Sequence, residues 1–149
     1  MSKAKHIYVI YVDAKPERVW DALITTDATR QYWGHDNVSD WKPGSRWQHV
    51  RTGDGSNKVD LVGKILESDR PHKLVMTWSF PQDENNPAQI SRVTFDIQPY
   101  RETRSKLTVT HDDLEPGSQM ESGIQHGWPL VLSNLKSYLE TGKVMPVLK

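Results

Sequence analysis

The segment "GWPLVLSNLKSYLETG", Gly127 to Gly142, decides the fold of this chain. Its large apolar residues recur at intervals of three and four, which places them on one face of an α-helix. They are Trp128, Val131, Leu132, Leu135, Tyr138 and Leu139. Pro129 suits the first turn of this helix, and Gly142 can adopt the left-handed conformation that ends one. A helix this short is marginal alone in water, so the rest of the chain must supply an apolar surface for it.

Composition limits the class of protein. A chain of 149 residues suits one domain, and we expect residues 1–149 to form it. Lysine plus arginine equal aspartate plus glutamate at 19 each, without blocks of one sign, so we expect no nucleic-acid partner. The absence of cysteine excludes disulfides and thiolate metal sites and suits the cytoplasm, where we expect the protein. No apolar run is long enough to span a membrane, and the first residues resemble a strand more than a signal peptide.

The first forty residues indicate one strand and two short helices. His6–Val12 ("HIYVIYV") is rich in β-branched and aromatic residues and predicts a strand buried on both faces. In the following "DAKPERVWDALIT", apolar residues recur at helical spacing and Asp13 is placed to cap the helix. A second short helix is predicted at Asp27–Gly34.

The middle of the chain alternates between strands and turns. Lys73–Phe80 and Gln89–Tyr100 both alternate apolar and polar residues, as does Lys106–Leu114. The cluster "GDGSN", Gly53 to Asn57, predicts a hairpin turn. We therefore predict an α+β fold with a curved antiparallel sheet of six to seven strands around the long C-terminal helix. The space between that helix and the concave face of the sheet is the candidate site.

Six segments together resemble the activator of heat-shock-protein-90 ATPase homologue (AHSA) branch of the START-like superfamily, also called SRPBCC. They are "DAKPERVWDAL", "YWG", "WKPGSRW", "GKILESDRPHKLVMTW", "SKLTVTHDDL" and "GWPLVLSNLKSYLETG". The resemblance implies the helix-grip fold and a cavity of the kind that holds lipids, steroids, polyketides or flavonoid-like molecules in that superfamily. The resemblance also suggests a chaperone as a partner. The eukaryotic namesake, however, pairs this domain with a separate N-terminal domain that does not occur in these 149 residues.

The candidate ligand-binding residues are those on the inward faces of the predicted elements. They are Trp33, Trp47, His49, Met76, Trp78, Phe95, His111, Trp128, Leu132 and Leu135. Each tryptophan of this set either lines a cavity or fills a core, and a buried indole N–H needs a hydrogen-bond partner. Trp20 is instead expected to pack in the core, and Trp41 in a loop or at the edge of the sheet.

The histidines bear on the alternatives of binding and catalysis. His49 shares a strand face with Trp47, and His111 shares one with Leu107 and Val109. If these faces point inward, both imidazoles could bind a ligand or act as a general base; otherwise they are satisfied, partly buried histidines. The sequence contains no metal-binding, nucleophile-elbow or phosphate-loop motif, so we predict no catalytic residue, metal or cofactor.

The sequence favours a small-molecule-binding domain for a hydrophobic, lipid-, flavonoid- or polyketide-like ligand. The first alternative is an enzyme of the polyketide cyclase or dehydratase type that uses His49 or His111 with an acidic partner. The second is a protein-interaction module for a chaperone, which needs a large apolar patch outside the cavity; the polar outer strand faces argue against one. A homodimer is compatible with the sequence, which does not select it.

Overall fold

The computed structural model describes residues 3–146 and contains one antiparallel sheet of seven strands in the order β1-β7-β6-β5-β4-β3-β2. The strands are β1 (Ala4–Val12), β2 (His35–Ser39), β3 (Arg46–Arg51), β4 (Val59–Asp69), β5 (Lys73–Trp78), β6 (Ser91–Tyr100) and β7 (Arg104–Leu114). The helices are α1 (Pro16–Ile24), α2 (Thr26–Tyr32) and α3 (Gln119–Thr141), and two short 3-10 turns are η1 (Pro81–Asp83) and η2 (Pro87–Gln89). The predicted α+β arrangement is confirmed, with two short helices after the first strand and a long C-terminal helix.

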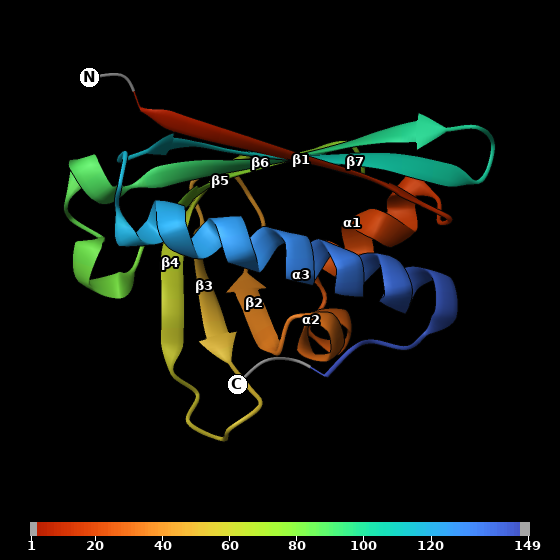
Figure 1. The fold of residues 1–149 in the computed structure, drawn as a ribbon, viewed down its shortest axis with the longest axis horizontal. Coiled ribbons are helices and arrows are strands. Elements are labelled where there is room, and N and C mark those ends of the chain that lie inside the picture. Colours follow the sequence, from red (N-terminus) through yellow and green to blue (C-terminus); the bar gives the residue numbers. More distant parts are fainter. Residues whose placement is uncertain (1–2, 147–149) are drawn as a thin grey trace.

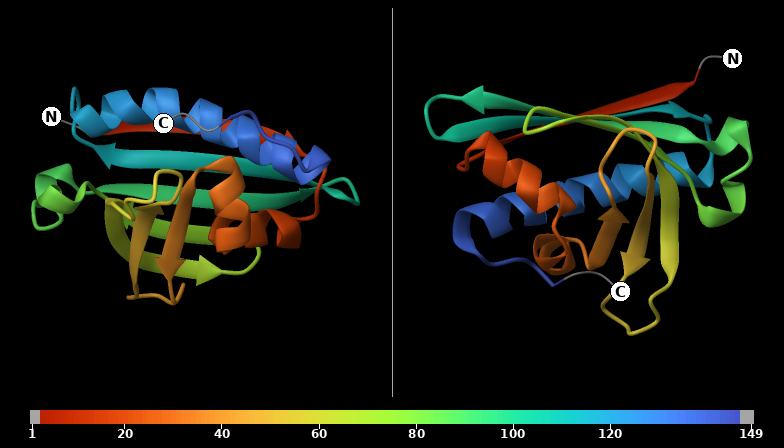
Figure 2. Two further views of the ribbon diagram at one scale, coloured as in Figure 1. Left: turned by 90° about the horizontal axis from the view of Figure 1, so that it is seen from below. Right: turned by 180° about the vertical axis from the view of Figure 1, so that it is seen from behind.

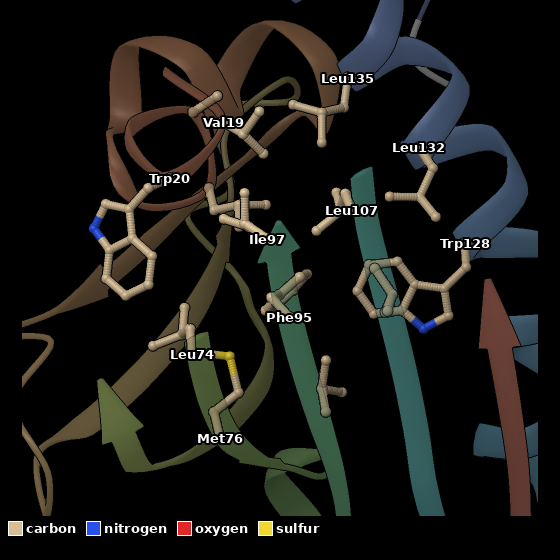
Figure 3. Close-up of a cluster of buried hydrophobic side chains, with 14 of the residues drawn as sticks. Val19, Trp20, Leu74, Met76, Phe95, Ile97, Leu107, Trp128, Leu132 and Leu135 are labelled. Atoms are coloured by element: carbon tan, nitrogen blue, oxygen red, sulfur yellow. The ribbon is translucent and has the colours of Figure 1, made fainter. Parts of the chain in front are cut away.

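The sheet curves around α3, which crosses its concave face (Figure 1). The helices α1 and α2 lie beside the C-terminal half of α3, and β2, β3 and β4 lie toward its N-terminal half (Figure 2). Close to α1, the interior is filled by large side chains from helices and sheet, among them Trp20, Ile97 and Leu135 (Figure 3). One end of α3 therefore covers a packed core, and its other end faces the strands of the candidate site.

The C-terminal helix begins eight residues before the predicted start at Gly127. Ser118 is its N-cap, where the Ser118 hydroxyl accepts a hydrogen bond from the Glu121 amide. The Glu121 carboxylate in turn accepts one from the Gly117 amide, so a serine and a glutamate three residues apart satisfy one amide of the first turn and one just before the helix. Pro129 lies inside the helix, not in its first turn, which corrects the prediction. The predicted left-handed cap at Gly142, with φ of 77°, is confirmed.

The prediction that the first strand is buried on both faces is wrong. Burial alternates along β1, and Ile7, Val9 and Tyr11 are each about half exposed. The reason is that β1 is an edge strand, and α3 covers only the concave face of the sheet. The outer face of this strand is thus apolar, contrary to the expectation that outer faces are polar.

The start of α1 also differs from the prediction. Lys15, not Asp13, occupies the N-cap position, and no side chain caps the helix. The Asp13 carboxylate lies 3.4 Å from Nε of Arg104, and its amide donates to Glu140. The second helix ends at Tyr32, followed by Gly34 with φ of 73°. No helix within residues 3–146 is long and apolar enough to cross a membrane.

Candidate ligand-binding site

A cavity of about 630 Å³ lies between the N-terminal half of α3 and the strands β2 to β5. A volume of this size is typical of small-molecule sites. One wall is formed by α3, and a second by aromatic residues at the ends of α2 and β5. The third consists of side chains on β2, β3 and β4, several of them polar. These three walls are far apart in the sequence and meet because the sheet curves toward the helix (Figure 1).

The helical wall combines apolar side chains with two glycines. The apolar side chains are Met120, Ile124, Trp128 and Val131. A β-carbon placed on Gly123 or Gly127 would have no atom within 4 Å. Neither packing nor backbone conformation therefore requires glycine at these positions, although glycine costs a helix roughly 0.5–1 kcal/mol relative to alanine. The consequence of the two glycines is open space beside α3.

Three tryptophans form the aromatic wall. Trp33 follows α2, Trp78 ends β5, and Trp128 belongs to α3. Their ring centroids lie 5.5–6.3 Å apart in tilted or stacked arrangements, which are favourable for aromatic pairs. The indole N–H of Trp78 is buried and has no hydrogen-bond partner among the described residues. The wall therefore presents apolar rings, and one of its tryptophans, Trp78, has a buried N–H donor without a partner among the described residues.

The polar end of the cavity contains an ion-paired cluster. Asp60 accepts hydrogen bonds from both Nε and a terminal nitrogen of Arg51, at 3.0 and 2.9 Å. The same carboxylate lies 2.8 Å from Nε2 of His35. Burial raises the pKa of Asp60, but the hydrogen bonds from Arg51 and His35 outweigh burial and hold the pKa below its ordinary value. Arg51 is half exposed at the edge of the cavity and does not enter it.

His49 lies deeper than His35 and stacks on it. The two imidazole rings are 3.9 Å apart and nearly parallel, at 5°. Nδ1 of His49 is 2.6 Å from the side-chain oxygen of Asn37, whose own amide nitrogen donates to the carbonyl of Leu23. Burial, and secondarily the neighbouring His35, lowers the pKa of His49 well below its ordinary value. His49 is therefore neutral at pH 7.

His111 lies behind the aromatic wall and does not line the cavity. Its Nδ1 accepts a hydrogen bond from the indole nitrogen of Trp128 at 3.1 Å, and its Nε2 lies 2.7 Å from the hydroxyl of Ser91. Both ring nitrogens are thus engaged, and burial lowers the pKa of His111 to about 3. This histidine fixes the orientation of Trp128.

Four of the ten predicted residues line the cavity, namely Trp33, His49, Trp78 and Trp128. The other six are buried beside it or in the core, namely Trp47, Met76, Phe95, His111, Leu132 and Leu135. Figure 3 shows Met76, Phe95, Leu132 and Leu135 among the side chains that fill the interior. Trp47 is fixed by a hydrogen bond of 2.7 Å from its indole nitrogen to the carbonyl of Thr77.

Several lining residues were not predicted from the sequence. On α3, Met120 and Ile124 precede Trp128 by eight and four residues, so the apolar stripe continues toward the N-terminus of the helix. That spacing would have identified them had the helix been extended back to Gln119. His35 and Asp60 gave no such signal, because strand pairing across two connections brings them together. Within residues 3–146 there is no cluster of three or more side chains suited to a metal ion.

The fold and the cavity define a helix-grip domain of the SRPBCC type. Residues 13–140 match the family described as activator of Hsp90 ATPase homolog 1-like protein (AHSA1), and the chain belongs to this family. The resemblance inferred from the sequence is thereby confirmed. Among curated proteins, no relative matches the sequence at a significant level.

Solved structures with the same fold include an Aha1 dimer from Colwellia psychrerythraea, with a TM-score of 0.75 and 20% identity over 94% of this chain and 98% of that one. An HSP90 activator from Plasmodium falciparum has a TM-score of 0.73 and 23% identity, covering 91% of this chain and 95% of that one. CalU16 from Micromonospora echinospora has a TM-score of 0.72 and 20% identity, covering 95% and 77%. At these identities, the similarity establishes the fold.

Proposed function

We propose that this chain is a small-molecule-binding domain that holds a hydrophobic ligand of lipid, flavonoid or polyketide type between the sheet and α3. The observation that carries the proposal is the glycine-lined cavity of about 630 Å³. Its helical wall has open space where alanine would be accommodated and would favour the helix. Its aromatic wall offers three indole rings for contact with an apolar ligand.

Filling the cavity from α3 tests this proposal. Gly127→Leu directs a leucine side chain into the open space, whereas the control Gln125→Leu adds the same side chain to an exposed helical position outside the cavity. Tryptophan fluorescence is titrated with oleic acid, naringenin and 2-naphthol. We expect saturable quenching in the wild type and in Gln125→Leu, and at least about tenfold weaker binding in Gly127→Leu. Equal affinities in all three proteins, or no binding by the wild type, would contradict the proposal.

The arrangement of the histidines favours binding over catalysis. A cyclase or dehydratase of the predicted type needs an imidazole that faces the cavity and contacts a carboxylate. His111 uses both ring nitrogens on Trp128 and Ser91, and Nδ1 of His49 contacts an amide, not a carboxylate. His35 does line the cavity and contact a carboxylate, but its two ring nitrogens face the carbonyl of Trp33 and the carboxylate of Asp60, so neither is open to a ligand. We therefore assign no catalytic residue.

A second candidate function is interaction with a chaperone. Membership of the AHSA1 family favours it, as does the fold shared with the Plasmodium HSP90 activator. The half-exposed Ile7, Val9 and Tyr11 on β1 offer an apolar surface outside the cavity. Titration of the protein into purified Hsp90, with ATP hydrolysis as the readout, tests this function; an unchanged ATPase rate and no binding would exclude it.

A further inference from the structure

The hydrogen bonds of the polar end determine which kind of ligand group fits there, given the proposed function. The side-chain oxygen of Asn37 faces His49, because the Asn37 amide nitrogen donates to the carbonyl of Leu23 at 3.2 Å. An amide oxygen only accepts hydrogen bonds, so Nδ1 of His49, 2.6 Å away, carries the proton. In a neutral imidazole the second nitrogen is then an acceptor. No described residue donates to Nε2 of His49, although the ring lines the cavity.

His35 has the opposite hydrogen-bonding pattern. Its Nδ1 faces the carbonyl of Trp33 at 3.0 Å, and its Nε2 faces the carboxylate of Asp60 at 2.8 Å. Both partners are acceptors. The carbonyl of Trp33 has no proton to donate, and the Asp60 carboxylate already accepts hydrogen bonds from Arg51 through both oxygens. Both ring nitrogens of His35 are therefore occupied by acceptors of the protein, and neither is open to a ligand.

Burial, and secondarily His35, keep His49 neutral. The parallel rings lie 3.9 Å apart, and two charged imidazoles at that distance would repel each other. Burial and His35 both lower the pKa of His49. The stacked pair thus divides the roles: His35 satisfies the carboxylate and the backbone carbonyl, and His49 offers an unprotonated nitrogen to the cavity.

We propose that the ligand carries a neutral hydroxyl on an aromatic ring, and that this hydroxyl donates a hydrogen bond to Nε2 of His49. The aromatic body is accommodated by Trp33, Trp78 and Trp128. A carboxylate or an ether oxygen at the same place would bring an acceptor against an acceptor and leave Nε2 without a partner. Lys58 lines the same end and would instead favour an anion, so an anionic probe belongs in the test.

The test compares three probes with one ring system at pH 7. They are 2-naphthol, its methyl ether 2-methoxynaphthalene, and the anion 2-naphthoate, each titrated calorimetrically into the wild type. We expect 2-naphthol to bind about fivefold to tenfold more tightly than the ether, the effect of one hydrogen bond, with naphthoate weakest. His49→Phe keeps a flat ring on His35 but removes the acceptor, so it should bring naphthol and ether within about twofold. The control His126→Phe changes an exposed histidine of α3 and should keep the preference.

The outcomes separate this inference from the proposed function. If naphthol and ether bind equally, naphthoate binds most tightly, or the preference survives in His49→Phe, the hydroxyl assignment is overturned, whereas binding itself still supports the proposed function. If no probe binds the wild type, both fail. Nitrogen-15 NMR of the ligand-free protein gives a second test, in which Nε2 of His49 should show the shift of an unprotonated nitrogen. A protonated Nε2 would overturn the inference whether or not any probe binds.

Discussion

The two ends of the space between the sheet and α3 differ in what fills them. Beside the C-terminal half of α3, the helix α1 contributes side chains such as Trp20, which belongs to the same buried cluster as Ile97 and Leu135 (Figure 3). Beside its N-terminal half, the part of the chain that the structure describes has no further α-helix and only the short η1 at the cavity, and α3 itself carries Gly123 and Gly127. The comparison teaches that the space is closed where α1 and α2 add large side chains and remains open where α3 carries glycine.

Truncation of a helix residue should have very different effects at the two ends. Leu135→Ala removes a fully buried side chain from the filled end and should lower the free energy of unfolding by about 3–4 kcal/mol. Val131→Ala, one turn earlier on the cavity wall, should cost less than about 1 kcal/mol because its side chain already borders open space. Urea denaturation of both variants measures the difference, and similar losses would show that the cavity end is packed as tightly as the core.

A glycine of the sheet, Gly63, should be required for stability, whereas the glycines of α3 are not. A β-carbon on Gly63 would lie 2.0 Å from the carbonyl oxygen of Thr77 and 2.4 Å from the indole nitrogen of Trp47. Gly63→Ala should therefore separate the hydrogen-bonded Trp47 and Thr77 and destabilise the protein by about 2–3 kcal/mol. Thermal and urea unfolding check this value, and a variant as stable as the wild type would refute the close packing behind the cavity.

Low pH should reduce the free energy of unfolding through His111, which lies behind the aromatic wall of the cavity. Its pKa in the folded protein is lowered to about 3, so below the unfolded value of about 6.5 the unfolded chain binds the extra proton. Stability then falls as the pH decreases from about 6.5 toward 3. At pH 5 this histidine alone should account for a loss of about 2 kcal/mol relative to pH 7.

The variant His111→Gln isolates this contribution. Between pH 7 and 5, its free energy of unfolding should decrease by about 2 kcal/mol less than that of the wild type. Parallel pH profiles of the two proteins would show that His111 is not held neutral by burial.

The smallest expected effect is a gain. Gly127→Ala adds a β-carbon that meets no atom within 4 Å and improves the propensity of α3, so it should raise the free energy of unfolding by about 0.5–1 kcal/mol. Urea denaturation measures the gain, and a loss of stability would mean that the space beside Gly127 is not open.

The sequence predicted the fold because its signals are local. Alternating strands, the turn at Gly53–Asn57 and the cap at Gly142 each depend on neighbouring residues. The start of α3 was missed because Gly123, Gly127 and Pro129 are unfavourable inside helices, whereas the cap formed by Ser118 and Glu121 determines where the helix begins.

The candidate site was predictable only in part. Trp33, Trp78 and Trp128 stand out by size and position, but the sequence does not distinguish a lining tryptophan from a buried one such as Trp47. The exposure of β1 depends on its place at the sheet edge, and the His35–Asp60 contact depends on three paired strands. Such long-range pairings are set by the whole sheet and leave no local pattern.

Native mass spectrometry of the gently purified wild type and Gly127→Leu tests the central claim most directly. Each protein is measured as isolated and after incubation with oleic acid, naringenin and 2-naphthol. If the open end of α3 is a ligand site, the wild type should carry one small molecule per chain, and Gly127→Leu should remain at the mass of the bare protein. A wild type without any adduct, or equal adducts on both proteins, would contradict the claim that the cavity binds a ligand.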